Sequence, residues 1–234
     1  SLSQKILHRP KRVTVAPVSS TAETIQQKIF FTNKSDKKHV LLHLLENKDL
    51  EQVLVFSRTK HGADRIVKHI KKKKIESAAI HGDKSQPQRQ KALNAFKSGD
   101  IRVLVATDIA ARGIDIEKLQ YVINYDIPNE PETYVHRIGR CGRAGESGIS
   151  ISISEPEENT YVRSIEKLTK CKIEVVENHP FPQTEKPMNA EEKKAFEKEK
   201  VERRKAYFAN KKKRNDGPKG GGSKRQGHGK PKRR

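Results

Sequence analysis

The chain is poor in the residues that build disulfide-linked, metal-bound or membrane-spanning folds. Its 234 residues include two cysteines, one methionine and no tryptophan. Cys141 and Cys171 are too few for a disulfide framework and show no metal-ligand spacing, which predicts free thiols and no bound metal in a reducing compartment. No apolar run reaches the roughly 18 residues that a membrane-spanning helix needs, and no charged-then-apolar signal segment opens the chain. We therefore expect a soluble, cytoplasmic protein without a membrane partner.

Acidic residues are scarce relative to basic ones. The chain has 50 Lys and Arg against 29 Asp and Glu, a formal net charge of +21, and the segment from Glu185 onward alone holds 19 basic and 7 acidic residues. Such a surface usually meets a polyanion, either nucleic acid or an anionic membrane, although a merely solubilising surface is the alternative. Residues 190–210 predict at most a marginal solvated helix. Residues 211–234 have no core-forming side chain, so the tail 181–234 is expected to be basic and largely disordered.

A regular pattern fills residues 21–180, whereas the first 20 residues have none. The chain opens without Met, and we expect residues 1–7 to end a helix of an upstream domain and an extended linker to follow. Strands are predicted at 27–32, 52–57, 77–81, 103–107, 121–125, 148–154 and 172–177, and helices at 37–47, 61–73, 86–97, 132–138 and 157–168. This alternation predicts an α/β fold with a parallel sheet flanked by helices. Ligand sites in such sheets lie where the strands end, here after residues 56, 80, 106 and 125.

One candidate site follows the strand predicted at 103–107. The segment 106–115 reads ATDIAARGID. Thr107 offers a hydroxyl and an N–H at the sheet edge, Gly113 allows a tight turn, and Asp115 offers a carboxylate that can accept hydrogen bonds from two ribose hydroxyls. On these residues alone the segment fits a simple turn as well as a binding site.

A second segment, 134–145, reads YVHRIGRCGRAG and carries three arginines. If it begins as a helix, the three-residue spacing keeps Arg137, Arg140 and Arg143 within one arc. Gly139 and Gly142 have no side chains, so a large group can approach the backbone at these positions. We find no acid in the pattern that would balance these guanidiniums in a core, whereas a phosphate chain would. Arginines aimed at a γ-phosphate stabilise charge in phosphoryl transfer.

Together these segments resemble the motifs of DEAD-box RNA helicases. Residues 136–145 (HRIGRCGRAG) resemble motif VI, 106–115 motif V, and 53–60 (VLVFSRTK) motif IV. Residues 80–93 contain a QxxR element, Gln86 and Arg89, and 122–128 (VINYDIP) is similar to the stretch between motifs V and VI. Order and spacing agree over roughly 13–177. The resemblance implies the C-terminal RecA-like domain of such a helicase. The sequences of segments 60–64 and 100–113 are similar to those of the bacterial RhlE-type subgroup.

The resemblance also implies a nucleotide site. Arg140 and Arg143 would be the finger arginines, and Asp115 would hold the ribose. Gly113 would provide the close turn, and His136 would couple the γ-phosphate site to the partner domain.

On the RNA side, the resemblance implies contacts to the sugar-phosphate backbone. Thr59, Arg89 and Thr107 would contact phosphates, Gly82 would offer its backbone N–H, and Arg58 is a weaker candidate. Contacts of this kind position a strand without reading its sequence.

Some elements of the complete family pattern are missing from the sequence. Nothing matches a GxxxxGK[ST] loop or a magnesium-binding Asp-Glu-Ala-Asp box, which belong to the first RecA-like domain. We therefore expect ATP with Mg²⁺ to bind between that domain and this one, and the chain alone to be a monomeric, weak RNA binder without ATPase activity. Two alternatives stay open: a stand-alone RNA-binding or annealing module driven by the tail, and a DNA-directed or protein-remodelling relative.

Cys141 departs from the family pattern, which more often has a small or hydroxylic residue at this position. Two flanking arginines can lower the pKa of a thiol and make it sensitive to oxidation. An inert residue of suitable size is the simpler interpretation.

Overall fold

A computed structural model of the chain describes residues 25–111, 116, 119–142 and 148–215. The chain divides into two units, Ser1–Pro187 and Met188–Arg234, which are described separately. The first unit contains the sheet that positions the predicted functional residues.

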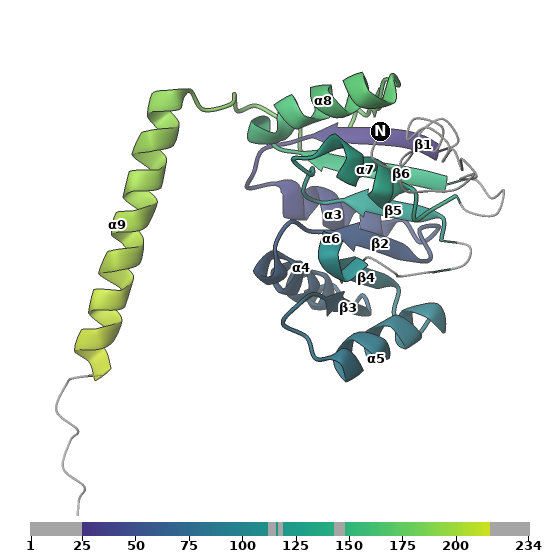
Figure 1. The fold of residues 1–234 in the computed structure, drawn as a ribbon, viewed down its shortest axis with the longest axis horizontal. Helices are drawn as coiled ribbons and strands as arrows, with labels where there is room; N and C mark the ends of the chain where they lie inside the picture. The colour runs from purple at the N-terminus through teal and green to yellow at the C-terminus, as the bar shows by residue number, and fades with distance from the viewer. Residues whose placement is uncertain (1–24, 112–115, 117–118, 143–147, 216–234) are drawn as a thin grey trace, which may run out of the picture. The chain divides into compact units, whose positions relative to one another are not determined.

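The described part of the first unit is built on a parallel sheet with the strand order β3-β4-β2-β5-β6-β1-β7, of which Figure 1 labels β1 to β6. This confirms the expected α/β fold. The strands are β1 (Ile25–Phe31), β2 (Val53–Phe56), β3 (Ser77–Ile80), β4 (Val103–Ala106), β5 (Tyr121–Asn124), β6 (Gly148–Ser154) and β7 (Glu174–Val175).

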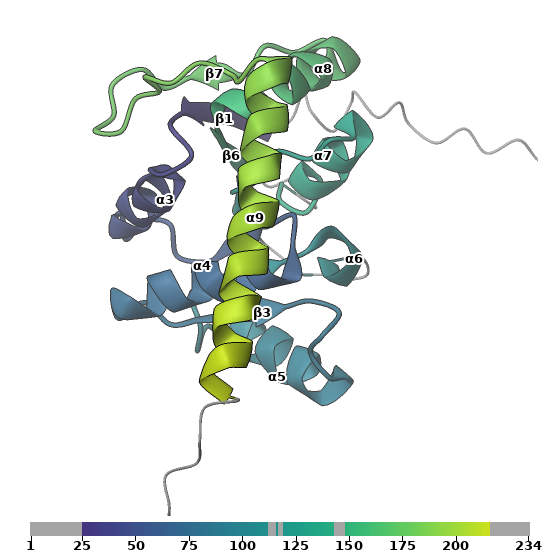
Figure 2. The same ribbon diagram turned by 90° about the vertical axis from the view of Figure 1, so that its left-hand side faces the viewer.

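Helices cover both faces of this sheet, so its central strands are apolar on both sides. Every residue of β2 and of β4 is buried. Successive strand residues point to opposite faces: Val55 packs with α3 and α4, whereas Leu54 and Phe56 pack with the core of α5 to α8. Figure 2 shows α3 and α4 on one side and α5, α6 and α7 on the other. The helices are α3 (Lys37–Glu46), α4 (Lys60–Lys72), α5 (Gln86–Lys97), α6 (Asp108–Ala111), α7 (Pro131–Ile138) and α8 (Asn159–Thr169).

Two helices begin directly behind the carboxyl ends of their strands, and side-chain caps fix where they start. Thr59 precedes α4, and its Oγ1 accepts the N–H of Gly62 at 3.0 Å. A Cβ on Gly62 would lie 2.6 Å from Ser57 Oγ and 2.8 Å from Thr59 Oγ1, so this tight entry requires glycine. Ser85 and Gln88 form a capping box at the start of α5. The N-termini of α4 and α5 therefore lie at the edge of the sheet where ligand sites were predicted.

The predicted elements are confirmed with three differences. The short helix α6 begins immediately after β4, in a segment too short for helical periodicity to be visible. β7 is limited to Glu174–Val175, because within the described ranges this edge strand pairs with β1 alone and both its residues are exposed. A 3-10 turn, Pro156–Glu158, precedes α8.

The second unit contains one described helix, α9 (Ala190–Asn215). It continues beyond residue 210, where the sequence predicted that a marginal helix would end. Its Glu, Lys and Arg residues are good helix formers, and ion pairs along it join Glu197 to Lys200 and Glu199 to Arg203. Residues 216–234 lie outside the described part. None of the helices in the described ranges is long and apolar enough to cross a membrane.

Candidate functional site

The loops at the carboxyl ends of β2, β3, β4 and β5 carry most of the residues predicted from the sequence. Parallel strands end at the same edge of a sheet, so residues distant in the chain become neighbours there. β2 leads to Thr59, β3 to Gly82, β4 to Thr107, and β5 to the loop before α7. This edge therefore brings together both groups of candidates.

The nucleotide candidates that the structure describes line one pocket of about 250 Å³. His136 lies on α7 and Arg140 follows that helix. Thr133 and the α6 residues Asp108 and Ala111 complete the rim, together with Phe56 and Arg137. His136 is exposed and Arg140 is half-buried. Arg140 Nε donates to the carbonyl oxygen of His136 at 3.3 Å, which orients the guanidinium. The pocket thus combines a fixed cation with an accessible imidazole.

Arg137 does not share the role of Arg140. It is buried, and its guanidinium forms a bidentate ion pair with Asp108, with Nε–Oδ1 and Nη2–Oδ2 distances of 2.6 and 2.9 Å. Its Nη1 donates to the Asp126 carbonyl at 2.6 Å, and the guanidinium lies over the Phe56 ring. The expectation that no acid balances these arginines is therefore wrong for Arg137. The acid stands 29 residues earlier, so only the fold reveals it.

Three predicted nucleotide residues lie outside the described ranges: Gly113, Asp115 and Arg143. Their roles in the turn, in ribose binding and as a second finger arginine stay predictions.

The RNA candidates after β2 and β4 present donors at the sheet edge. Because Thr59 Oγ1 already accepts the Gly62 N–H, its own O–H remains available to donate to a phosphate. Thr107 is half-buried, and its N–H donates to the Ile80 carbonyl at 3.3 Å, which ties the start of α6 to β3. Both hydroxyls therefore sit on backbone fixed by adjacent elements.

The RNA candidates after β3 lie at the start of α5. Arg89 donates from Nη1 to Gln86 Oε1 at 3.2 Å, and within the described residues its Nε is buried without a hydrogen-bond partner. Gly82 is exposed, and an added Cβ would meet no heavy atom within 4 Å. Packing does not require glycine at this position, which fits the close approach of a ligand.

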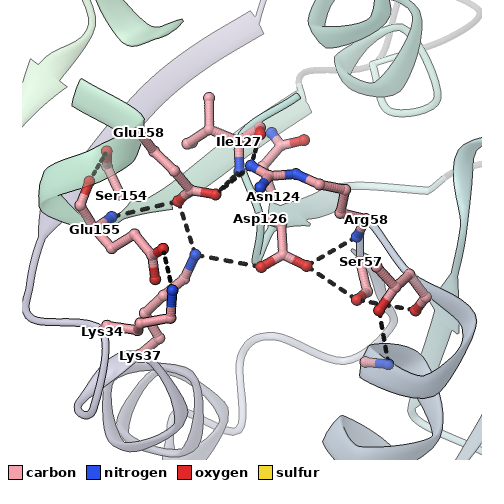
Figure 3. A network of polar contacts seen from close by, with 12 residues as sticks. Lys34, Lys37, Ser57, Arg58, Asn124, Asp126, Ile127, Ser154, Glu155 and Glu158 are labelled. Atoms are coloured by element: carbon pink, nitrogen blue, oxygen red, sulfur yellow. Dashed lines mark hydrogen bonds and ion pairs between the residues drawn. The ribbon is translucent and has the colours of Figure 1, made fainter. Parts of the chain in front are cut away.

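Arg58 belongs to a polar network that the sequence did not predict (Figure 3). Its Nη2 donates to Glu158 Oε1 at 2.6 Å and to the Ile127 carbonyl at 2.7 Å. Lys37 Nζ lies 2.8 Å from Glu158 Oε2 and 3.3 Å from Asp126 Oδ1. The Arg58 guanidinium is thus held by these bonds although its side chain is 42% exposed, and its contact with RNA stays a prediction.

Asp126 links this network to the loop after β2. Its Oδ2 accepts from Ser57 Oγ at 3.0 Å and from the Arg58 backbone N–H at 2.8 Å. Burial would raise the pKa of the Asp126 carboxyl, but Lys37, the Arg58 N–H and the Ser57 hydroxyl outweigh it and hold that pKa below its usual value. An ionised Asp126 therefore fixes the backbone immediately before Thr59.

The chemistry expected of Cys141 is corrected by its burial. The thiol is 1% exposed and donates to the Ile138 carbonyl at 3.1 Å. Burial raises the pKa of Cys141 to about 12. The expected lowering by neighbouring arginines is therefore wrong, and the inert interpretation holds.

Comparison with known proteins places this arrangement in a family. A model described as "Helicase conserved C-terminal domain" matches residues 36–145. The chain is 40% identical over 173 residues to the ATP-dependent RNA helicase CshA of Listeria monocytogenes, covering 74% of this chain and 33% of CshA. It therefore spans about a third of the length of the curated relatives that it matches.

Two solved structures extend the comparison. Escherichia coli SrmB, bound to regulator of ribonuclease activity A, aligns with a TM-score of 0.66 and 30% identity over 70% of this chain and 98% of that chain. Saccharomyces cerevisiae Dbp5, bound to RNA and ADP BeF3, aligns with a TM-score of 0.67 and 29% identity over 75% of this chain and 47% of that one. The finer likeness to the RhlE-type subgroup stays a prediction. The chain belongs to the DEAD-box family, and its sheet unit is the C-terminal helicase domain of that family.

Proposed function

We propose that this chain is the C-terminal RecA-like half of an ATP-dependent RNA helicase. It would remodel short RNA duplexes with ATP bound between this domain and a first RecA-like domain. The observation that carries the proposal is the pocket of about 250 Å³ beside Thr107, in which His136 and Arg140 lie together. A nucleotide pocket and candidate RNA contacts then share one edge of one sheet.

Arg140 would act on the transferred phosphoryl group. Its guanidinium is oriented by the His136 carbonyl and lies at a pocket mouth that another domain can close. Charge develops on the phosphoryl oxygens during transfer, and a positioned arginine stabilises it. His136 is exposed at the same mouth, where it can couple the phosphate site to the first domain. Asp115 and Gly113 would hold the ribose, and Arg143 would be the second finger.

On the RNA side, Thr59, Gly82, Arg89 and Thr107 would hold the sugar-phosphate backbone. Thr59 caps α4 and Arg89 lies in the first turn of α5, where the positive end of the helix dipole favours an anion. Gly82 lies in the loop that leads to α5, and Thr107 directly precedes α6. The Dbp5 relative was solved with RNA and ADP BeF3 together, which supports both ligands for this domain. Arg58 stays the weaker candidate because Glu158 already binds its guanidinium.

The proposed RNA site and the proposed nucleotide site are connected by a short stretch of backbone and one ion pair. Thr107 is followed directly by Asp108, and Asp108 holds Arg137 through two hydrogen bonds. Arg137 stands three residues before Arg140. A displacement of the RNA-contacting end of β4 would therefore reach the finger arginine through one rigid ion pair.

The remaining parts of the reaction would come from the first RecA-like domain. That domain would supply the phosphate-binding loop and the carboxylate that holds Mg²⁺. The chain alone, expected to be monomeric, should bind RNA weakly and should not hydrolyse ATP.

The test is to measure ATP turnover by the purified chain, with and without RNA, before and after adding the matching first domain. We expect none from the chain alone and RNA-stimulated turnover from the pair, abolished by Arg140→Ala. Turnover by the chain alone, after a check for contaminants, would contradict the proposal. Strand annealing that ignores ATP and the first domain would favour the stand-alone RNA-binding module.

A further inference from the structure

A second cavity, of about 440 Å³, lies beside Thr59 on the side of the sheet that α3 and α4 cover. We call it the α3–α4 groove. It is distinct from the nucleotide pocket, which α6 and α7 form on the other face. Its rim comes from both helices and the loops before them and carries the cations Lys34, Lys38, Arg58 and Arg65, together with the imidazole of His69.

The acids that line the groove are each already paired with a cation, including Glu155, which binds Lys34 at 3.1 Å. Glu158 binds Lys37 and Arg58, and Asp126 binds Lys37 (Figure 3). Lys38 and Arg65 are exposed, and among the described residues neither forms an ion pair. The rim therefore keeps positive charge that the floor does not cancel.

The pKa of His69 responds to the charges at this rim. Its pKa is lowered first by burial and then by the positive charges of four neighbours. Those cations come from both helices: Lys72, Lys38, Arg65 and Lys68. The largest electrostatic contributions to the shift are all from cations, which is consistent with a positive potential at the imidazole.

We propose that the α3–α4 groove binds the phosphodiester backbone of an RNA segment adjacent to the one that Thr59 contacts. The groove and the Thr59 hydroxyl adjoin at the N-terminus of α4, so one strand can occupy both. Lys38 and Arg65 would bind its phosphates from opposite walls. The inference rests on the proposed function, and it lengthens the RNA path beyond the residues predicted from sequence.

The lining favours RNA over an acidic peptide or protein. A stable protein partner usually needs apolar or aromatic anchors in a well-packed pocket. Here, apart from the imidazole of His69, Ile66 and Tyr125 are the only apolar or aromatic side chains among the described lining residues. Lysine, arginine, serine and threonine make up most of the rest, and the three lining acids are already paired with cations. Such groups position a phosphate backbone without reading bases.

The first test removes the two unpaired charges in the full 234-residue chain. Lys38→Gln/Arg65→Gln is compared with Lys71→Gln/Lys97→Gln, two exposed lysines that do not line the groove. We expect the groove variant to bind single-stranded RNA on the order of tenfold more weakly. Its plot of log affinity against log salt should flatten by about 1.4, since each lost phosphate contact removes about 0.7. The control should change less than about twofold.

The second test follows His69 by NMR titration with single-stranded RNA or with polyglutamate. RNA should raise the pKa of His69, because a bound phosphate favours the imidazolium. Equal losses of RNA affinity in the groove and control variants would overturn the proposal. It would also be overturned if polyglutamate raised the pKa of His69 and RNA did not. If the groove fails while the two-domain enzyme still shows RNA-stimulated turnover, the proposed function stands and the groove alone is refuted.

Discussion

Replacing Lys37 with methionine would remove the ammonium that lies between two carboxylates of the sheet edge. Lys37 Nζ contacts Glu158 at 2.8 Å and Asp126 at 3.3 Å, and the side chains of Lys37 and Glu158 are 3% and 2% exposed. Methionine has a similar length and no charge, so the substitution tests the charge rather than the volume.

The expected loss of stability follows from the burial of the pair. Breaking a buried ion pair by removing one partner typically costs 3–5 kcal/mol, because the other charge is left without compensation. Arg58 and the Ile127 N–H still bind Glu158 in the variant, so we expect the lower end, about 3 kcal/mol. For a domain of this size that corresponds to a melting temperature lower by roughly 6–12 °C.

The loss should depend on pH in a defined direction. The lowered pKa of Asp126 means that its ionised form stabilises the wild type above the unfolded pKa of about 3.9, and this contribution is lost as the pH falls through the folded pKa. Without Lys37 the pKa values of Asp126 and Glu158 should rise, and protonation then relieves the unpaired charge. The difference in the free energy of unfolding between variant and wild type should therefore become smaller as the pH falls from 7 to about 4.

Urea unfolding followed by circular dichroism at several pH values measures both effects. Lys38→Met is the matched control: the neighbouring lysine is exposed, and its loss should change the free energy of unfolding by less than about 0.5 kcal/mol. A loss below about 1 kcal/mol for Lys37→Met, with no dependence on pH, would refute the reasoning.

Three further outcomes are expected. In the two-domain enzyme, Arg140→Ala should lower kcat by a factor on the order of 10³ and weaken ATP binding less, as steady-state kinetics and nucleotide titration would reveal; an unchanged kcat would reject the finger assignment. Arg137→Lys should lower the free energy of unfolding by about 2–3 kcal/mol, because lysine cannot make the bidentate pair with Asp108; urea titration checks this, and an unchanged midpoint would contradict it. Iodoacetamide at pH 8 should modify half-buried Cys171 before Cys141, whose thiol is buried and has a pKa of about 12; mass spectrometry of peptides showing the reverse order would contradict the burial argument.

The sheet could be predicted because its signals are local. Continuous apolar runs such as those of β2 and β4 need burial on both faces, and the spacing of apolar residues in α3 and α4 is helical. The edge of the sheet was harder to predict. β7 depends on one neighbouring strand rather than on its own pattern, and α6 has only four residues.

The site residues could be predicted only where they lie together in one sequence motif. His136 and Arg140 stand in one segment, and the structure places both in one pocket. The supporting charges were missed because their partners are remote in sequence: Lys37 and Glu158 lie 121 residues apart, and Arg137 and Asp108 lie 29 apart. No periodicity links such positions, so the sequence alone did not show that an ion pair with Asp108 makes Arg137 structural.

The loop between β5 and α7 gives the two halves of the site a common support. The Asp126 carbonyl accepts from Arg137, which stands behind the nucleotide pocket, while the carboxylate of the same residue accepts from Ser57 and the Arg58 N–H before Thr59. A hydrogen bond to a charged group contributes roughly 1.5–3 kcal/mol, more than most neutral ones. Asp126 is thus held on one side by the Arg137 guanidinium and on the other by Lys37, Ser57 and the Arg58 N–H. Neither α7, which leads to Arg140, nor the loop before Thr59 can shift far without disturbing it. A buried network of this kind would keep the proposed phosphate pocket and the proposed strand-binding loop in fixed register while the rim of each remains open.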